Sequence, residues 1–352
     1  MLRSPKALLI LAAALVILVV ALLGGALGEA FGFGFLGAPL AAIHIPAEPM
    51  LADPIIGDFQ ITNTMVATWI AIVVLLIIAL KVRSGLSDVP GRFQGLVEVI
   101  LEFFLNLAES IAGRDRARLF FPLVMSIFLF IFVANWIGIL PGFGTIGRIE
   151  TADEIAHHYC DKYHDDESKY DDCLAHKQVQ IFEGEGAFGY LAPGSVGSDV
   201  SIKEWKENPQ PGKQAGLLVP WFRSANTDLN TTLAIAIVAM VMIHFWAFRA
   251  LGVFGHVGKF INFKQGPIGF FVGILELISE AARLISFTFR LFGNIFAGEV
   301  LLAAMIFLIP LIGIIPFLGL ELFVGLIQAF IFSMLTLVFA AAATVAHNGD
   351  HH

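Results

Sequence analysis

Charged residues are scarce in this chain of 352 residues. Asp, Glu, Lys and Arg make up 14% of it, whereas soluble globular proteins carry about 25%. Hydrophobic residues make up 57%, and the mean hydropathy is +0.82. This composition argues against a soluble enzyme, a disordered chain and a nucleic-acid-binding protein. It predicts an all-α polytopic membrane protein.

Cysteines are few, and nucleotide-binding motifs are absent. The two cysteines cannot form a disulfide-rich framework. The sequence contains no Gly-x-x-x-x-Gly-Lys-Ser/Thr phosphate loop, so any nucleotide chemistry must take place on other chains. Gly293 and Gly298 lie within an apolar run rather than after a strand, which favours close helix packing over a dinucleotide-binding fingerprint. We therefore expect no cofactor, and no catalytic activity of this chain alone.

Long apolar runs are the main feature that is present. A helix needs about 20 residues to cross a hydrocarbon core of about 30 Å. Runs of this kind cover residues 7–27, 64–80, 120–140, 231–251, 267–309 and 317–346. They are continuous rather than alternating, which favours membrane helices over a membrane β-barrel.

Residues 93–112 form a different kind of segment. Its polar residues recur at helical spacing on one narrow arc, and apolar residues fill the rest. The polar positions are Gln94, Glu98, Glu102, Asn106 and Glu109. The pattern predicts an amphipathic helix at the membrane interface, or a span with one polar stripe facing protein.

Basic residues gather in three short loops and predict the orientation of the chain. They are Lys81, Arg83 and Arg92, then Arg114, Arg116 and Arg118, and then Arg249, Lys259 and Lys264. By the positive-inside rule these loops are cytoplasmic. The acidic segment 142–228 then lies outside, and the C-terminus lies in the cytoplasm.

The run 267–309 is too long for one upright span. A helix of this length extends about 63 Å at 1.5 Å per residue, twice the hydrocarbon thickness. No polar turn divides it into two spans. We therefore predict one long, strongly tilted helix, which needs a large protein neighbour along its length.

This predicted helix contains charges that are costly within a membrane. Insertion of one charge at the bilayer centre costs about 2.5–3.5 kcal/mol, so such residues indicate function. Arg290 has no acid three or four positions away, and because arginine stays protonated, it requires an anion from elsewhere, for example from another chain. Glu280 and Arg283 instead have the spacing of a local pair. Glu276, Arg283, Arg290 and Asn294 share one face, Glu299 lies on the opposite face, and Glu321 and Gln328 share a face of the last helix.

A motif in this region resembles a known family. The sequence Phe-Arg-Leu-Phe-Gly-Asn-Ile-Phe-Ala-Gly-Glu at 289–299 is similar to the signature of subunit a of the membrane (Fo) sector of the rotary F-type ATP synthase. Supporting segments follow the family order at 135–142, 227–234 and 328–332. The resemblance is strong over 225–345 and looser over 60–142. It implies about five membrane or intramembrane helices after the N-terminal apolar segment.

The resemblance also implies a mechanism. In this family the subunit is a stator that faces a ring of c subunits and provides two aqueous half-channels, so that proton flow drives ring rotation and ATP synthesis. Arg290 matches the essential arginine that faces the ring. Asn294, Glu299, Glu321 and Gln328 match the external half-channel, and Ser286, Glu276 and Arg283 match the cytoplasmic exit. Glu321 is a departure, because many bacterial members have histidine there.

Partners and location follow from the same resemblance. The expected partners are the c-subunit ring, the peripheral-stalk b subunits, the remaining ATP synthase subunits and the lipid bilayer of a bacterial inner membrane. We expect no nucleic acid as a partner. We divide the chain into a signal-like or first transmembrane segment (1–28), an external segment (29–63), membrane helices (64–141), an external acidic loop (142–228), a proton-translocating helix core (229–346) and a cytoplasmic tail (347–352).

Several alternatives stay open at the level of the sequence. The competing function is a self-contained ion channel or secondary transporter, although no convincing internal repeat supports it. Cys160 and Cys173 permit a disulfide, and the nearby histidines (His157, His158, His164 and His176) permit a metal site. The coupling ion is H⁺ or Na⁺, with H⁺ favoured because no Na⁺ cage is evident. Either of two acids, Glu299 or Glu321, can relay the proton.

Overall fold

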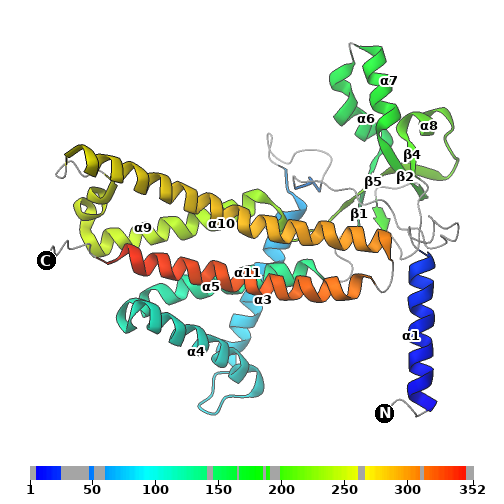
Figure 1. Ribbon diagram of the computed structural model, residues 1–352. Coiled ribbons are helices and arrows are strands. Elements are labelled where there is room, and N and C mark those ends of the chain that lie inside the picture. The colour runs from blue at the N-terminus through cyan, green and yellow to red at the C-terminus, as the bar shows by residue number, and fades with distance from the viewer. Residues whose placement is uncertain are drawn as a thin grey trace. The chain divides into compact units, whose positions relative to one another are not determined.

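The computed structural model describes residues 5–24, 47–50, 60–140, 146–164, 166–184, 188–190, 199–260, 266–309 and 313–345 (Figure 1). Most of the predicted external segment 29–63 and the predicted tail 347–352 lie outside this part. The chain forms two compact units, each built from segments that are distant in the sequence. Unit 1 comprises Met1–Val66, Gly138–Arg223 and Ala297–Glu321, and unit 2 comprises Ala67–Ile137, Ser224–Phe296 and Leu322–His352.

Long helices dominate the chain, as predicted. They are α1 (Pro5–Gly24), α3 (Asn63–Ser84), α4 (Arg92–Ala112), α5 (Arg114–Gly138), α9 (Leu229–Phe260), α10 (Gly266–Leu308) and α11 (Ile314–Ala343). Within the described residues, the stretches Asn63–Ser84, Arg114–Gly138, Leu229–Val253 and Ile314–Ala343 are long and apolar enough to cross a membrane. The prediction of a polytopic helical membrane protein is therefore confirmed.

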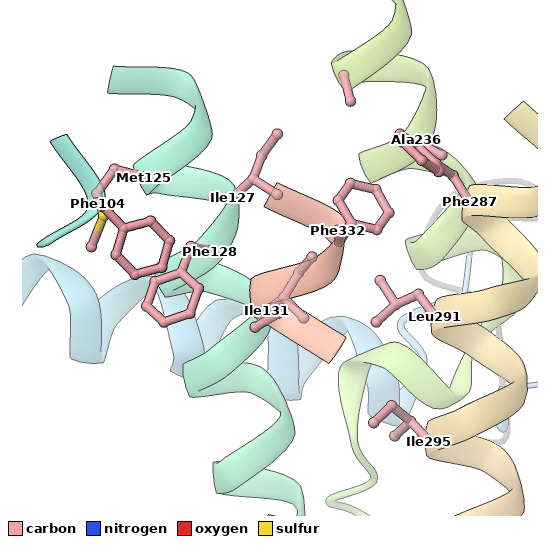
Figure 2. Close-up of a cluster of buried hydrophobic side chains, with 12 residues drawn as sticks. Phe104, Met125, Ile127, Phe128, Ile131, Ala236, Phe287, Leu291, Ile295 and Phe332 are labelled. Carbon is pink, nitrogen blue, oxygen red and sulfur yellow. The ribbon is translucent and has the colours of Figure 1, made fainter. Parts of the chain in front are cut away.

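The core of unit 2 is a cluster of apolar side chains from five helices (Figure 2). Helix α4 contributes Phe104, whose ring centroid lies 4.2 Å from that of Phe128 on α5. Phe287 of α10 packs against Phe332 of α11 at 4.9 Å. Because lipid is as apolar as these side chains, the close packing itself, rather than exclusion of water, holds the helices together.

Helix α10 is a single helix of 43 residues, which matches the predicted run 267–309. At 1.5 Å per residue it is about 65 Å long. Helix α9, in contrast, changes direction at Gly252, which has a φ of 73°. This left-handed backbone conformation favours glycine because other residues strain there. The segment that follows Gly252 thus departs from the axis of the membrane helix.

Helix α4 covers the predicted amphipathic segment. It buries Gln94, Phe104, Ala108 and Ala112, while Leu96, Val99 and Phe103 are exposed on a second face. The carboxylates of Glu98 and Glu102 are exposed on a third face. An apolar face and a polar face on one exposed helix are typical of a helix at a membrane–water interface.

The segment predicted as an external acidic loop contains a folded α/β domain in unit 1. Its elements are β1 (Ile146–Thr151), α6 (Ala152–Cys160), η1 (Asp161–Tyr163), α7 (Glu167–His176), β2 (Gln178–Glu183), β3 (Phe188–Tyr190), β4 (Asp199–Ser201), α8 (Ile202–Glu207) and β5 (Lys213–Pro220). The strands form an antiparallel sheet in the order β3-β1-β5-β2-β4. Residues 225–227, which precede α9, form the short helix η2 (Ala225–Thr227).

Local signals in the sequence begin the helices of this domain. Thr151 and Glu154 form a capping box at the start of α6, which satisfies backbone N–H groups that the helix leaves unpaired. The side chains of Asp166 and Ser201 cap α7 and α8 by accepting from the backbone N–H groups of Lys169 and Glu204, respectively. The helices then bury Ile155, Ile202 and their neighbours against the sheet.

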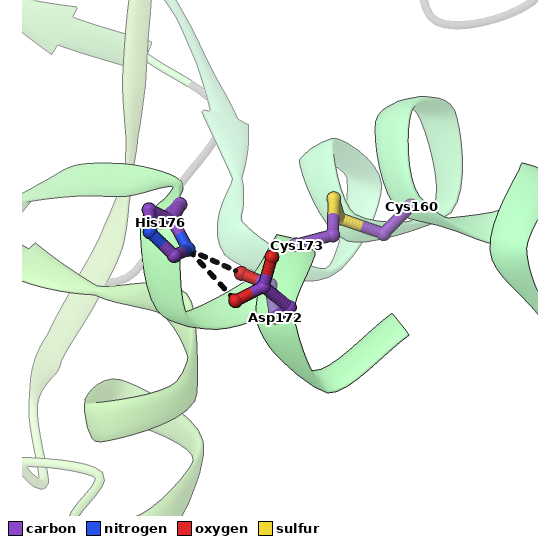
Figure 3. The surroundings of a disulfide bond; sticks show 4 residues. All are labelled: Cys160, Asp172, Cys173 and His176. Carbon is purple, nitrogen blue, oxygen red and sulfur yellow. Dashed lines mark hydrogen bonds and ion pairs between the residues drawn. A yellow bond between two sulfur atoms is a disulfide. The ribbon is translucent and has the colours of Figure 1, made fainter. Parts of the chain in front are cut away.

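Cys160 and Cys173 form a disulfide that joins the end of α6 to α7 (Figure 3). His176 is the last residue of α7, and its Nδ1 lies 2.8 Å from the backbone oxygen of Asp172 one turn earlier. His157 is 3.2 Å from Asp161. No group of three or more His, Cys, Asp or Glu that could hold a metal occurs among the described residues. Of the alternatives that the sequence left open, the structure has the disulfide.

Candidate functional site

Arg290 lies on the exposed face of α10. The helix turns Phe287, Leu291 and Ile295 into the core of unit 2, and this four-residue spacing leaves Arg290 and Phe289 on the outside. The Arg290 Nη2 donates to Ser286 Oγ at 3.4 Å, one turn earlier. Among the described residues no carboxylate forms an ion pair with Arg290. A permanent cation therefore faces outward from an apolar helix.

A pocket of about 390 Å³ lies beside this arginine within unit 2. Its lining residues are Ser279, Ala282, Arg283, Ser286, Phe287, Arg290, Leu335 and Phe339. The pocket thus brings Arg283 and Ser286, two of the predicted exit residues, together with Arg290. The third, Glu276, is exposed and does not line the pocket. Since a water molecule occupies about 30 Å³ in the liquid, the pocket has room for a chain of waters.

Arg283 is held in this pocket from two sides. Its Nη1 donates to both carboxylate oxygens of Glu280, at 2.7 and 2.8 Å. Its guanidinium lies 4.1 Å from the ring centroid of Phe339 on α11. The local pair suggested by the spacing of these two residues is therefore present. The Glu280 carboxylate therefore largely balances the charge of Arg283, whereas no carboxylate of the described residues pairs with Arg290.

Asn294 and Gln328 connect α10 to α11 in unit 2. The Asn294 Nδ2 donates to Gln328 Oε1 at 2.8 Å. Gln328 is 2% exposed, and its Nε2 has no hydrogen-bond partner among the described residues. The structure thus brings together two of the residues predicted for the external half-channel. In the described part of the chain, Gln328 bonds to Asn294 and not to Arg290.

The two predicted acids lie near each other in unit 1. Glu321 is 7% exposed and close enough to Glu299 to interact electrostatically. A Cβ added at Gly298 would overlap the carboxylate of Glu321. Glycine at 298 therefore permits the close approach of this side chain to α10.

Sequence reasoning missed a basic residue, Arg223, that pairs with one of these two acids. Arg223 follows β5 and donates from Nε to both carboxylate oxygens of Glu299, at 3.1 and 3.2 Å. Its side chain is only 5% exposed. The signal in the sequence is a single basic residue directly before the Ser-Ala-Asn-Thr-Asp run at 224–228 that precedes a membrane helix.

Asn135 and Trp136 of α5 hydrogen-bond to α11 and to the short helix η2 within unit 2. Asn135 of α5 donates from Nδ2 to the backbone oxygen of Gly325 at 3.1 Å. Its Oδ1 accepts from Asn226 Nδ2 at 2.6 Å. Trp136 donates from Nε1 to the Leu322 carbonyl at 3.2 Å. The Asn-Trp dipeptide therefore connects α5 to α11 and to η2, the short helix before α9.

Residues 65–341 match the family described as the ATP synthase A chain. The chain belongs to this family. The sequence is 28% identical to ATP synthase subunit a of Desulforamulus reducens over 299 residues, which cover 82% of each chain. It is 26% identical to ATP synthase subunit a of Campylobacter concisus over 282 residues, 79% of this chain and 88% of the relative. The corresponding protein of Acinetobacter baumannii is 28% identical over 289 residues, 79% of this chain and 80% of the relative.

Membership of the ATP synthase A chain family confirms the resemblance drawn from the motif at 289–299. The chain is thus a multi-pass membrane protein of the Fo sector that serves ATP synthesis and ion transport. The matched range includes every residue predicted for the half-channels. As a member of this family, the chain works together with other subunits of an ATP synthase.

Proposed function

We propose that this chain is the proton-conducting stator of the Fo sector and that it couples proton flow to rotation of a c-subunit ring. The observation that carries the proposal is Arg290, an exposed cation on α10 for which no carboxylate of the described chain provides the counter-charge. A carboxylate on a neighbouring subunit supplies that charge. The long exposed face of α10 supports a ring as that neighbour.

Arg290 acts by electrostatics. A unit pair at about 4 Å and an effective dielectric constant of about 20 interacts by about 4 kcal/mol. That energy is large enough to favour release of a proton from a ring carboxylate that approaches Arg290. The same positive charge opposes direct passage of a proton between the two half-channels, so net transfer requires the ring to turn.

The two half-channels use different residues. We assign Asn294, Gln328, Glu299 and Glu321 to the external half-channel. We assign Ser286, Arg283 and Glu276 to the cytoplasmic exit, which is supported by the pocket beside Arg290 for the first two residues. Each half-channel connects one side of the membrane to a ring carboxylate, and rotation of the ring carries the proton from one half-channel to the other.

Membership of the family supports a set of partner subunits. We propose the c-subunit ring, the peripheral-stalk b subunits and the remaining ATP synthase subunits, assembled in a bacterial inner membrane. The three basic loops support an external position of 142–228 and a cytoplasmic position of the C-terminus. The catalytic nucleotide chemistry belongs to the other subunits of the complex.

Reconstitution with and without the ring tests the proposal. The chain alone and the chain with a c ring are placed in liposomes, a potassium diffusion potential is applied, and an internal pH-sensitive dye reports proton uptake. We expect proton flux only when the ring is present. An equal flux through the isolated chain would overturn the proposal and favour a self-contained channel or transporter. Parallel measurement of Na⁺ uptake determines the coupling ion.

A further inference from the structure

Arg223 and Glu299 form a partly buried ion pair within unit 1. The Arg223 Nε donates to both carboxylate oxygens of Glu299, and the side-chain exposures are 5% for the arginine and 42% for the acid. A buried guanidinium that lost this carboxylate would lack much of its compensation. The pair therefore favours the ionised form of Glu299.

Glu321 has a different environment although it lies close to Glu299. It is 7% exposed, and its carboxylate packs against the backbone at Gly298. Among the described residues, no hydrogen bond or ion pair joins Glu321 to a cation. A buried carboxylate without a counter-charge is stable mainly in its neutral form. In the described part of the chain, Glu299 thus has a cationic partner and Glu321 has none.

The backbone around Arg223 is anchored at several points. Strand β5 ends at Pro220, whose carbonyl accepts from Asn63 Nδ2 at 3.1 Å. The next residue, Trp221, donates from its backbone N to the carbonyl of Ile146 on β1 at 3.0 Å. Because these bonds hold the chain just before Arg223, the guanidinium projects from a fixed support. The external α/β domain supplies that support through β1 and β5.

We propose that Arg223 is a positioning residue that keeps Glu299 ionised, so that Glu321 is the carboxylate that takes up and releases the transported proton. In this sequence an O–H bond forms on Glu321 when a proton arrives from the external side, and it breaks when the proton passes toward the ring. Glu299 remains a carboxylate paired with Arg223 throughout. The inference rests on the proposed function and adds the role of each acid.

The test uses the assembled ATP synthase in inverted membrane vesicles, with ATP-driven proton pumping as the readout and a native gel to measure assembly. Arg223→Gln should lower pumping by about tenfold, equivalent to about 1.4 kcal/mol, because Glu299 loses its partner. Adding Glu299→Gln should restore much of this loss, since a neutral amide needs no counter-charge. Arg223→Lys, which keeps the charge, should lose less than Arg223→Gln.

A matched control exists in the external domain. Arg148 pairs with Glu154 at 3.2 Å, with side-chain exposures of 16% and 43%, similar to the pair under test. Arg148→Gln removes an equivalent ion pair that is distant in sequence from the residues predicted for the half-channels. We therefore expect this variant to pump protons at the normal rate. A comparable loss in this variant would show that Arg223→Gln acts through the fold of the domain and would overturn the proposal.

Glu321→Gln and Glu299→Gln provide a comparison that leaves Arg223 unchanged. We expect Glu321→Gln to abolish pumping and Glu299→Gln to reduce it only partly. The reverse order would overturn the inference while leaving the stator function intact, because a proton relay would still be needed. A double variant as inactive as Arg223→Gln alone would also overturn it. Normal pumping in both single acid variants would additionally refute the proposed external half-channel.

Discussion

Alanine at position 298 tests the contact between α10 and the carboxylate of Glu321. A Cβ at this position would overlap the carboxylate, whereas ordinary contacts lie at 3.4–4 Å. The end of the Glu321 side chain must therefore move by more than about 1 Å, and misplacement of a reacting group by about 1 Å can lower a rate by about 100-fold. We expect Gly298→Ala to lower ATP-driven proton pumping by about 10- to 100-fold.

The expected loss does not come from the helix itself. Alanine is more favourable than glycine inside a helix by about 0.5–1 kcal/mol, so α10 should become more stable. Gly319→Ala is the matched control, because Gly319 lies in α11 and a Cβ there meets nothing within 4 Å. It should pump normally.

The assay is fluorescence quenching of a pH-sensitive dye in inverted membrane vesicles, corrected for the amount of assembled complex. Glu321→Asp shortens the side chain by one methylene and makes room for the new Cβ. The variant with both changes should therefore pump faster than Gly298→Ala alone. Normal pumping by Gly298→Ala, or no improvement on adding Glu321→Asp, would refute the reasoning.

Three changes elsewhere test stability, the first two by pulse proteolysis of the full-length protein after equilibration in urea. Replacing Cys160 and Cys173 by serine removes a cross-link at a sequence separation of 13 and should lower the free energy of unfolding of the α/β domain by about 3 kcal/mol; an unchanged urea midpoint would contradict this. Burial raises the pKa of Glu150 in the folded protein above its ordinary value. The stabilisation from protonated Glu150 is therefore complete below the ordinary pKa, which applies to the unfolded chain, and it is lost as the pH rises through the raised pKa of the folded protein. Glu150→Gln should flatten this decline, and an equally steep decline would contradict the assignment. Asn135→Leu leaves Asn226 without its partner and should lower stability by about 1–3 kcal/mol, seen as an earlier thermal transition in detergent; an unchanged transition would argue against the buried amide network.

The membrane helices are predictable from the sequence because the bilayer imposes a length on each apolar run. Position on a helix is also predictable, since Phe287, Leu291 and Ile295 recur every four residues and face the core. The same periodicity leaves Arg290 on the exposed face. Local chemistry thus determines which side chains of α10 lie inside and which lie outside.

The α/β domain formed by β1–β5 and α6–α8 is much harder to predict. Its strands are short, and β1 pairs with β5, for example Ile149 with Leu218, across a long stretch of chain. Only local signals such as the capping box at Thr151 and Glu154 are visible in the sequence. Contacts between distant residues determine the sheet, and no periodic pattern encodes them.

Arg223, in the candidate functional site, shows the same limit of prediction from the sequence. Its partner Glu299 is 76 residues away, and the sequence around Arg223 contains no pattern that points to this partner. The sequence indicates that a buried or membrane-embedded acid needs compensation, but it does not identify the residue that provides it. Similarly, the resemblance assigns Gln328 to the external half-channel but does not reveal that its side chain bonds to Asn294.

Proton pumping by the Arg290→Ala variant tests the central claim most directly. The measurement compares ATP-driven pumping in inverted vesicles that hold equal amounts of assembled complex, with Arg249→Ala, an exposed arginine of α9, as the control. Arg290 is exposed and packs little within the chain, so assembly should be normal. If Arg290 supplies the charge that faces the ring, Arg290→Ala should show no pumping and no coupled ATP synthesis, and Arg249→Ala should show normal values. Pumping by Arg290→Ala at the normal rate would contradict this role of Arg290.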